Sequence, residues 1–103
     1  MRAMLTASLL LACFPAMVQA AGSLAAGREK YTQCASCHGA DGRSIVMPQY
    51  PKIGGQNAEY VVNALKAYRD GRRQGTYAEI MKEVAKQLSD SDIENLAAYI
   101  ESL

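Results

Sequence analysis

One short segment constrains this chain more than any other. It is the pentapeptide from Cys34 to His38, which reads Cys-Ala-Ser-Cys-His. The 103 residues of the chain are enough for one small domain. A domain of this size has a modest hydrophobic core and usually depends on a staple such as a disulfide, a metal or a bound cofactor. We therefore expect the fold to be organised around whatever these two thiols and this imidazole hold.

The spacing of the two cysteines favours covalent attachment of a haem. Cysteines at positions i and i+3 followed directly by histidine form the haem-attachment pattern. A helical turn places the thiols of Cys34 and Cys37 on one side, where both can reach the vinyl groups of a single porphyrin. His38 is then directed at the iron as an axial ligand. The sequence predicts one covalently bound haem c and its iron.

Three other roles compete for the same residues. Zinc usually takes four ligands, and beyond residue 20 the chain offers two cysteines, one histidine and no second cluster. A redox-active dithiol of the thioredoxin kind would be flanked by a strand–helix pattern, and the sequence has no strand pattern. A structural disulfide would leave His38 without a role. The haem interpretation is the one that uses all three side chains.

Residues 1–20 predict export. Arg2 is followed by an apolar run over 4–14 and then by small residues that end at Ala20. A basic start, an apolar middle and a small-residue end are typical of a secretory signal peptide. The apolar run is shorter than the roughly 20 residues that span a bilayer. We expect cleavage after about Ala20, a periplasmic location and a haem-binding domain over 21–103.

Cys13 offers an alternative end for the signal segment. The stretch Leu10-Leu11-Ala12-Cys13 resembles the lipoprotein processing box, in which the cysteine becomes the lipidated first residue. The apolar stretch before it is short, and the small residues up to Ala20 provide an ordinary cleavage site. We therefore expect a protein without a lipid anchor, and the mass of the mature protein distinguishes the two outcomes.

The charge balance argues against nucleic acid as a partner. The whole chain has 11 basic and 10 acidic residues, and without Arg2 the two kinds are equal in number. A nucleic-acid-binding surface needs a clear basic excess. We expect the partners to be proteins.

The hydrophobic pattern predicts an all-α domain of about four helices. A short helix is expected over 24–33, running into the cysteine pair, and a loop rich in glycine and proline follows over 36–56. Asn57 is a good N-cap for the next helix, and Gly71 is expected to end it. The buried face of that helix is predicted from residues at helical spacing: Val61, Ala64, Leu65 and Tyr68.

Two further helices complete the predicted domain. One is expected over 77–86. The last has the clearest start, because Ser89 caps it and Asp92 follows three residues later in a form of the capping box. Its predicted buried stripe consists of Ile93, Leu96, Ala97 and Ile100.

A haem iron with one histidine has either a sixth ligand or an open coordination site. Beyond the predicted signal the chain has no second histidine and two methionines, Met47 and Met81. Thioether sulfur is a soft donor that favours reduced iron and raises its potential. Met81 lies in the predicted helix over 77–86, where filling the core is the competing role. Met47 lies in the glycine- and proline-rich loop, so both residues are candidates.

Several segments besides the pentapeptide resemble the class I c-type cytochromes. The resemblance covers essentially all of 21–103, and it is closest to small periplasmic single-haem members and to one half of the tandem two-haem members. It implies a small class I cytochrome c fold, with about four helices wrapped around one covalent haem. The matching segments are Gly27 and Tyr31, residues 51–56 (Pro-Lys-Ile-Gly-Gly-Gln), Met81, Leu88-Ser89-Asp90 and residues 96–100 (Leu-Ala-Ala-Tyr-Ile).

The resemblance also implies roles for individual residues. The distal methionine of the family lies a few residues before the final helix, which Met81 matches and Met47 does not. A proline carbonyl of the family commonly holds the ring of the axial histidine, and Pro51 is the matching residue for His38. The terminal helices of the family cross with a small residue and an aromatic ring in contact, which fits Gly27 and Tyr31 facing Leu96 and Tyr99.

Surface residues around the predicted haem have candidate roles too. Gln56 and Tyr60 can reach the haem propionates, with capping or ordinary surface roles as the alternative. The loop over 45–47 is expected at the exposed haem edge as a small docking patch for transient partners. Four basic residues lie close together near the predicted end of the helix that starts after Asn57: Lys66, Arg69, Arg72 and Arg73. They form either a solvated face or a surface that meets an acidic patch on a redox partner.

An iron with both axial positions filled exchanges electrons without binding a substrate. We therefore expect an exported one-electron carrier rather than an enzyme, monomeric, serving redox partner proteins in a respiratory or other periplasmic chain. One alternative is a dedicated cytochrome subunit of a periplasmic dehydrogenase or related oxidoreductase complex. Another is an enzyme or gas sensor with an open sixth position.

Overall fold

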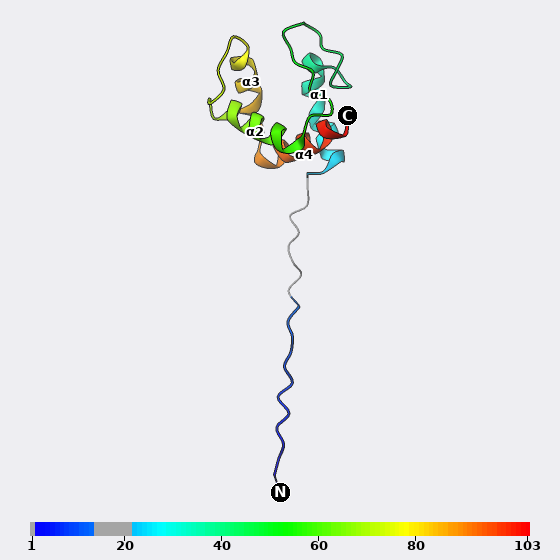
Figure 1. Cartoon of the computed structure of the whole chain (residues 1–103), viewed down its shortest axis with the longest axis vertical. Helices are drawn as coiled ribbons and strands as arrows, with labels where there is room; N and C mark the ends of the chain where they lie inside the picture. Colours follow the sequence, from blue (N-terminus) through cyan, green and yellow to red (C-terminus); the bar gives the residue numbers. More distant parts are fainter. Residues whose placement is uncertain (1, 14–21) are drawn as a thin grey trace.

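The computed structural model describes residues 2–13 and 22–103, and within these ranges it contains helices and no β-strand (Figure 1). The predicted all-α class is confirmed. None of the described helices combines the length and the apolar composition needed to cross a bilayer. The predicted cleavage site after Ala20 lies outside the described residues. The helices are α1 (Leu24–His38), α2 (Ala58–Arg69), α3 (Ala78–Ala85) and α4 (Asp90–Ser102).

Helix α1 is longer than the sequence pattern predicted. The Ser23 hydroxyl caps its start by accepting a hydrogen bond from the Ala26 N–H, at 3.2 Å. The expected loop from residue 36 was wrong, because the helix continues through both cysteines and ends only at His38. Gly39 then adopts φ 83°, a left-handed conformation that glycine tolerates best. The attachment pentapeptide is therefore the last part of a regular helix.

Helices α2 and α4 begin where their predicted caps, Asn57 and Ser89, stand. The Asn57 side chain accepts a hydrogen bond from the Tyr60 N–H at the start of α2. Ser89 and Asp92 form the complete capping box at the start of α4, with both bonds at 3.0 Å. Such reciprocal bonds satisfy two backbone donors that the first helical turn leaves free. Gly71, at φ 74°, follows the end of α2 and reverses the chain.

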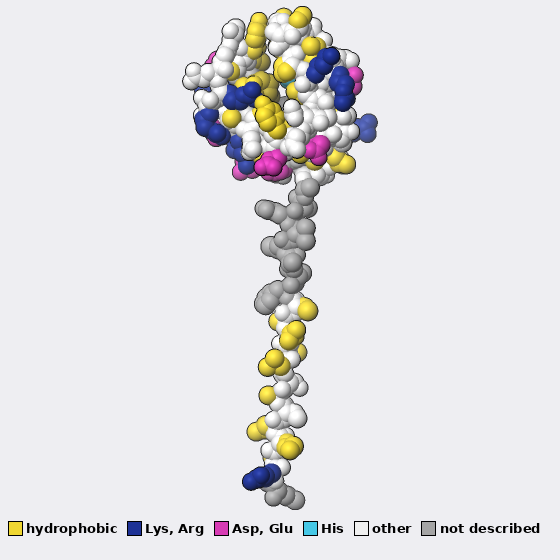
Figure 2. Space-filling view, in the orientation of Figure 1, with side chains coloured by type: hydrophobic (Ala, Val, Ile, Leu, Met, Phe, Trp, Pro, Cys, Tyr) yellow, Lys and Arg dark blue, Asp and Glu magenta, His cyan; other side chains and the backbone are white. Residues whose placement is uncertain are grey.

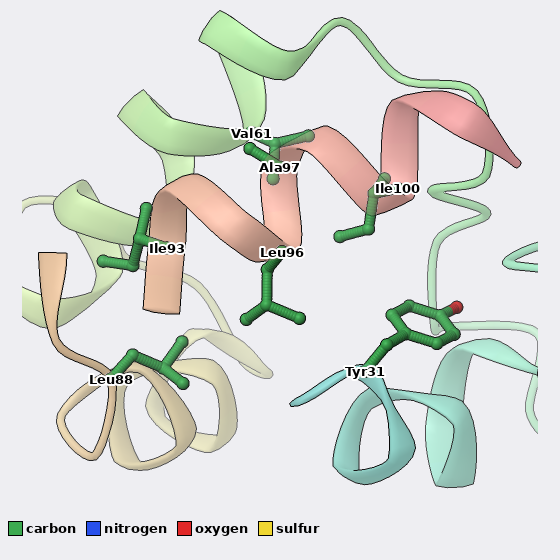
Figure 3. Close-up of a cluster of buried hydrophobic side chains, with 7 residues drawn as sticks. All are labelled: Tyr31, Val61, Leu88, Ile93, Leu96, Ala97 and Ile100. Carbon is green, nitrogen blue, oxygen red and sulfur yellow. The ribbon is translucent and has the colours of Figure 1, made fainter. Parts of the chain in front are cut away.

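Helix α4 is the centre of the domain. It packs against both α1 and α2, and α2 packs against α3. Figure 3 shows α4 running between Val61 of α2 on one side and Tyr31 of α1 on the other. The predicted buried stripe is confirmed, because each of its four residues is at most 3% exposed: Ile93, Leu96, Ala97 and Ile100.

The first and last helices cross at very close range. A Cβ atom on Gly27 would collide with the carbonyl of Asn95 and lie 2.9 Å from the Tyr99 Cβ. One turn further along, the rings of Tyr31 and Tyr99 lie 5.3 Å apart at an interplanar angle of 59°. The predicted crossing of a small residue and an aromatic ring is confirmed. This crossing fixes the position of the end of α1, and hence of the attachment segment, relative to the core.

Candidate haem site

The three residues of the attachment motif face one cavity. Cys34, Cys37 and His38, all on the last turns of α1, line a cavity of about 300 Å³. The cysteines are half-buried and unpaired, and His38 is buried. Helical spacing explains the arrangement, because residues three and four apart share one helix face.

The ring of His38 is held in one orientation. Its Nδ1 atom lies 2.7 Å from the carbonyl oxygen of Pro51, and His38 is only 7% exposed. A carbonyl oxygen can only accept a hydrogen bond, so Nδ1 carries the proton and donates it. The lone pair of Nε2 is then free to bind a metal. The contact with Pro51 that the resemblance implied is present in the structure.

A second cavity, of about 220 Å³, continues the first one toward α2. Four residues line both cavities: His38, Pro51, Tyr68 and Met81. The two cavities are therefore parts of a single crevice. Figure 1 shows α1 and the following loop on one side of it and α3 on the other. Figure 2 shows hydrophobic side chains gathered in the hollow between these two parts, with Lys and Arg side chains on both sides.

The two candidate methionines have different surroundings. Met81 projects from α3 into the crevice and lines both of its parts. Met47 is 42% exposed, lines neither cavity, and its sulfur accepts a hydrogen bond from the Gln49 amide at 3.7 Å. The structure brings Met81 and His38 to the same crevice and leaves Met47 on the surface.

The surroundings of the cysteines disfavour zinc and dithiol chemistry. Within the described residues there is no cluster of three or more His, Cys, Asp or Glu side chains that could hold a metal ion. Burial, with a smaller contribution from Cys37, raises the pKa of the Cys34 thiol to about 11. Reactive dithiols need the opposite, a lowered pKa that supplies thiolate at neutral pH.

The residues around the crevice fit a haem. Two thiols and one imidazole nitrogen face the same space, and a thioether sulfur lines it too. The walls combine aromatic rings with aliphatic side chains, as a flat and largely apolar macrocycle requires. These wall residues are Tyr50, Ile53, Val61, Leu65, Tyr68, Ile80 and Val84.

Comparison with known proteins agrees with this geometry. The family model of cytochrome c matches residues 24–103. This chain is a class I c-type cytochrome. Members of the family bind haem c covalently through cysteines, so haem c is the cofactor of this cytochrome, and the fold is the small class I cytochrome c fold.

The relatives of this cytochrome fall into two lengths. It is 48% identical over 82 residues to cytochrome c-554(548) of Halomonas halodenitrificans, covering 80% of this chain and 98% of that protein. It is 38% identical over 102 residues to cytochrome c4 of Pseudomonas aeruginosa, covering 99% of this chain but only 49% of the relative. The chain thus spans nearly all of one relative and about half of the other.

A solved structure gives the same result. The crystal structure of reduced recombinant cytochrome c4 from Pseudomonas stutzeri superposes with a TM-score of 0.70 at 32% sequence identity. The match covers 82% of this chain and 52% of the other. The similarity therefore extends over the helical domain of this cytochrome and about half of its longer neighbour.

The remaining predicted site residues are distributed around the crevice. Gln56 and Tyr60 both line its second part, although the side-chain Oε1 of Gln56 also accepts a hydrogen bond from the Asn57 N–H at 2.8 Å. In the loop over 45–47, Val46 is 59% exposed, as a docking patch requires. Their roles toward propionates and partners stay predictions.

The predicted basic group is not a free positive patch. Arg69 forms an ion pair with Asp90 at 2.7 Å, and Arg72 forms one with Asp70 at 3.1 Å. The Arg73 guanidinium lies 4.5 Å from the centre of the Tyr68 ring, in a cation–π contact. Internal pairing therefore reduces the charge that this group offers to a partner.

Two tyrosines of the crevice were not predicted from the sequence. Tyr50 and Tyr77 approach each other edge to face, with ring centres 6.3 Å apart, and both line the first cavity. They come from different sides, since Tyr50 precedes Pro51 and Tyr77 precedes α3. Both lie outside regular helical spacing, so no periodic pattern singles them out. Tyr68 did have a signal, because it shares the predicted face of α2.

Proposed function

We propose that this cytochrome is an exported one-electron carrier with a single haem attached through Cys34 and Cys37. His38 and Met81 would then hold the iron of that haem. Membership of the cytochrome c family already makes the chain a haem electron carrier. The observation that supports the finer assignment best is the crevice, which has the free ring nitrogen of His38 and the side chain of Met81 in one lining.

The haem supplies an iron that gains and loses one electron, and the chain determines how readily it does so. The hydrogen bond to Pro51 fixes the tautomer and orientation of the His38 ring. The thioether of Met81 favours the reduced state. The aromatic and aliphatic walls keep water away, which limits reorganisation when the charge changes. With His38 and Met81 both bound to the iron, electron transfer requires no substrate to bind there.

The boundaries of the exported protein are part of the same proposal. We assign residues 1–20 to a cleaved signal and 21–103 to the cytochrome domain, which acts as a monomer in the periplasm. Cys13 is then removed with the signal rather than lipidated. The mass of the purified protein tests this: it should equal residues 21–103 plus one haem. An added diacylglycerol on Cys13 would contradict it.

Visible spectroscopy of two variants tests the axial ligands. The oxidised wild-type protein should have the weak charge-transfer band that marks a thioether–iron bond. Met81→Ala should abolish this band and lower the midpoint potential, because a soft donor is lost. Met47→Ala is the matched control and should leave both unchanged, since Met47 is on the surface.

Two results would contradict the ligand assignment. The first is loss of the band in Met47→Ala with its retention in Met81→Ala. The second is rapid binding of carbon monoxide by the reduced wild-type protein at neutral pH. That result would mean an open sixth position, and it would favour a catalytic or gas-sensing role over electron transfer.

A role as a dedicated subunit is the second candidate. A protein of Stutzerimonas stutzeri named "Thiosulfate dehydrogenase electron acceptor" is 31% identical over 67 residues, covering 65% of this chain and 31% of that protein. The exposed loop over 45–47 suits either a transient or a stable contact. Size-exclusion chromatography of the protein purified from its own cells distinguishes the two. A free carrier elutes at the mass of one domain, and a subunit elutes with its enzyme.

A further inference from the structure

The buried hydroxyl of Tyr31 donates a hydrogen bond to Gly39, the residue that directly follows His38. The acceptor is the carbonyl oxygen of Gly39, at 2.7 Å, and the Tyr31 side chain is 3% exposed. Burial, with smaller contributions from neighbouring groups, raises the pKa of this hydroxyl to about 12. Tyr31 therefore keeps its proton, and remains a donor, at neutral pH.

The acceptor of this bond is the first residue of a turn. The Gly39 carbonyl also accepts a hydrogen bond from the Gly42 N–H at 3.1 Å. The turn is tight, because a Cβ on Gly39 would lie 2.5 Å from the Ser44 carbonyl oxygen, and Gly39 has φ 83°. Tyr31 thus attaches the start of the loop after α1 to the middle of α1 itself.

The turn is attached in its own right to the segment that carries Pro51. The Gly42 carbonyl accepts hydrogen bonds from the Ile53 N–H at 2.8 Å and the Gly54 N–H at 3.0 Å. Ile53 is two residues beyond Pro51, whose carbonyl accepts the hydrogen bond from His38. Hydrogen bonds linked by short stretches of backbone therefore lead from the Tyr31 hydroxyl, through the loop, to the ring of His38.

We infer that Tyr31 is a positioning residue for the axial histidine, and that its hydroxyl sets the strength of the hydrogen bond between His38 and Pro51. The inference rests on the proposed function, because it requires His38 to bind the iron. Tyr31 itself lines neither part of the crevice. It acts by holding the loop that presents the Pro51 carbonyl.

The expected direction of the effect follows from the chemistry of the ring. A strong bond from Nδ1 to a carbonyl raises the basicity of Nε2, which stabilises the more highly charged ferric iron. Loss of the Tyr31 hydroxyl leaves the Gly39 carbonyl with one donor instead of two and loosens the loop. The bond to Pro51 then weakens, and the reduced state becomes relatively more stable.

Tyr31→Phe tests this in the haem-loaded protein, because it removes one oxygen and keeps the ring in the core. The equilibrium constant for reduction should rise by about threefold. This is smaller than the roughly 10- to 100-fold effect of removing a group that bonds directly to a metal ligand, because Tyr31 acts on His38 only through the loop. The nuclear magnetic resonance shifts of the haem methyl groups, which report the orientation of the axial ring, should move as well. Tyr99→Phe is the matched control, since it removes a hydroxyl from the same ring pair; that hydroxyl makes no hydrogen bond within the described residues.

A purely structural role for Tyr31 gives a different result. Tyr31→Phe would then lower the free energy of unfolding of both oxidation states equally and leave the potential and the haem methyl shifts as in Tyr99→Phe. That outcome overturns the inference. If Tyr31→Phe does not fold, replacement of Tyr31 by 3-fluorotyrosine keeps the bond and makes the donor more acidic. The equilibrium constant for reduction should then fall, and an unchanged constant overturns the inference.

Failure of the inference is distinguishable from failure of the proposed function. The wild-type spectrum and its dependence on Met81 establish the ligands before any Tyr31 variant is measured. An iron without a histidine ligand would already be apparent in the wild-type protein. An unchanged potential in Tyr31→Phe, with normal ligation in the wild type, removes only the positioning role.

Discussion

The two sides of the haem crevice are held together by different kinds of interaction. On the side of α1, backbone groups of the loop over 39–56 bond to one another and to α4, as in the bond from the Gly55 N–H to the Ile100 carbonyl at 2.8 Å. On the side of α2 and α3, side chains pack against one another, as Arg73 does on Tyr68. The position of His38 is therefore set largely by backbone hydrogen bonds of the loop and by the crossing of α1 and α4, and that of Met81 by side-chain packing.

The connection between the two sides is narrow. Among the described helices, α1 packs only against α4, and α3 packs only against α2. The side that carries His38 and the side that carries Met81 are thus joined through α2 and α4, and by the contact between the rings of Tyr50 and Tyr77. A haem bound as proposed would contact both sides and supply packing between them.

Removal of the haem should destabilise the protein more than any other change, because it takes away the packing between the two sides. We expect Cys34→Ala/Cys37→Ala to produce a largely unfolded chain, because a domain of this size buries too little surface without its centre. Far-ultraviolet circular dichroism should lose most of its helical signal, and hydrogen exchange should locate any residual helix in α1 and α4. A native-like spectrum with a cooperative unfolding transition would contradict this expectation.

The crossing of α1 and α4 should be the next most sensitive feature. Gly27→Ala places a Cβ against the backbone of α4, and such overpacking costs about 2 kcal/mol in the free energy of unfolding. Denaturant titration of the haem-loaded protein measures it. The charge-transfer band that the proposal assigns to Met81 should be unchanged in the folded variant, since α3 does not contact α1.

Ala25→Gly is the matched control for helix propensity. Ala25 is on the exposed side of α1, and glycine there should cost about 1 kcal/mol through backbone entropy alone. If Gly27→Ala stabilised the protein by that same amount, the close approach of the two helices would be wrong.

On the other side of the crevice, Arg69 joins α2 to α4. Its guanidinium donates to the Leu88 carbonyl at 3.2 Å and pairs with Asp90 at 2.7 Å. Arg69→Met should lower the free energy of unfolding by about 1 kcal/mol, because the Leu88 carbonyl loses its donor. Arg72→Met removes only a more exposed ion pair and should have almost no effect. Equal effects of the two variants would contradict the structural role of Arg69.

The smallest predicted effect concerns the loop after α1. Hydrogen bonds from the backbone N–H groups of Arg43 and Ser44, and from the Ser44 hydroxyl, hold the pKa of Asp41 at about 2. A lowered pKa means that the ionised carboxylate stabilises the fold above pH 4 and that this contribution disappears as the pH falls toward 2.

Asp41→Asn provides the measurement. Wild type should melt at a higher temperature than the variant at neutral pH, and the difference should close as the pH is lowered from 4 to 2. A difference that stays constant over this range would mean that ionisation of Asp41 does not stabilise the loop.

Residues with local signals were predictable from the sequence. Ser89, Asp92 and Asn57 act through hydrogen bonds within one helical turn, so their identity and spacing predicted the starts of α2 and α4. The stripe of α4 followed from helical periodicity. The attachment motif is likewise local, because its chemistry depends on spacing within five residues.

Residues that act over long distances in sequence were not predictable in this way. The glycines and prolines over 36–56 indicated a loop from residue 36, whereas α1 continues to His38 because no residue before Gly39 breaks the helix. The bond from Tyr31 to Gly39 and the pairing of Tyr50 with Tyr77 depend on how the loops fold back. The neutralisation of Arg69 by Asp90 depends on the approach of two helices. Neither periodicity nor spacing encodes such contacts.

The packing of α1 on α4 also governs when this protein can fold. Gly27 of α1 is covered by Asn95 and Tyr99 of α4, which lie far along the chain from it. Contacts between such distant segments close a long loop and form late in folding. The attachment cysteines therefore stay accessible on a flexible chain until α1 and α4 have met, which gives covalent modification time to precede burial.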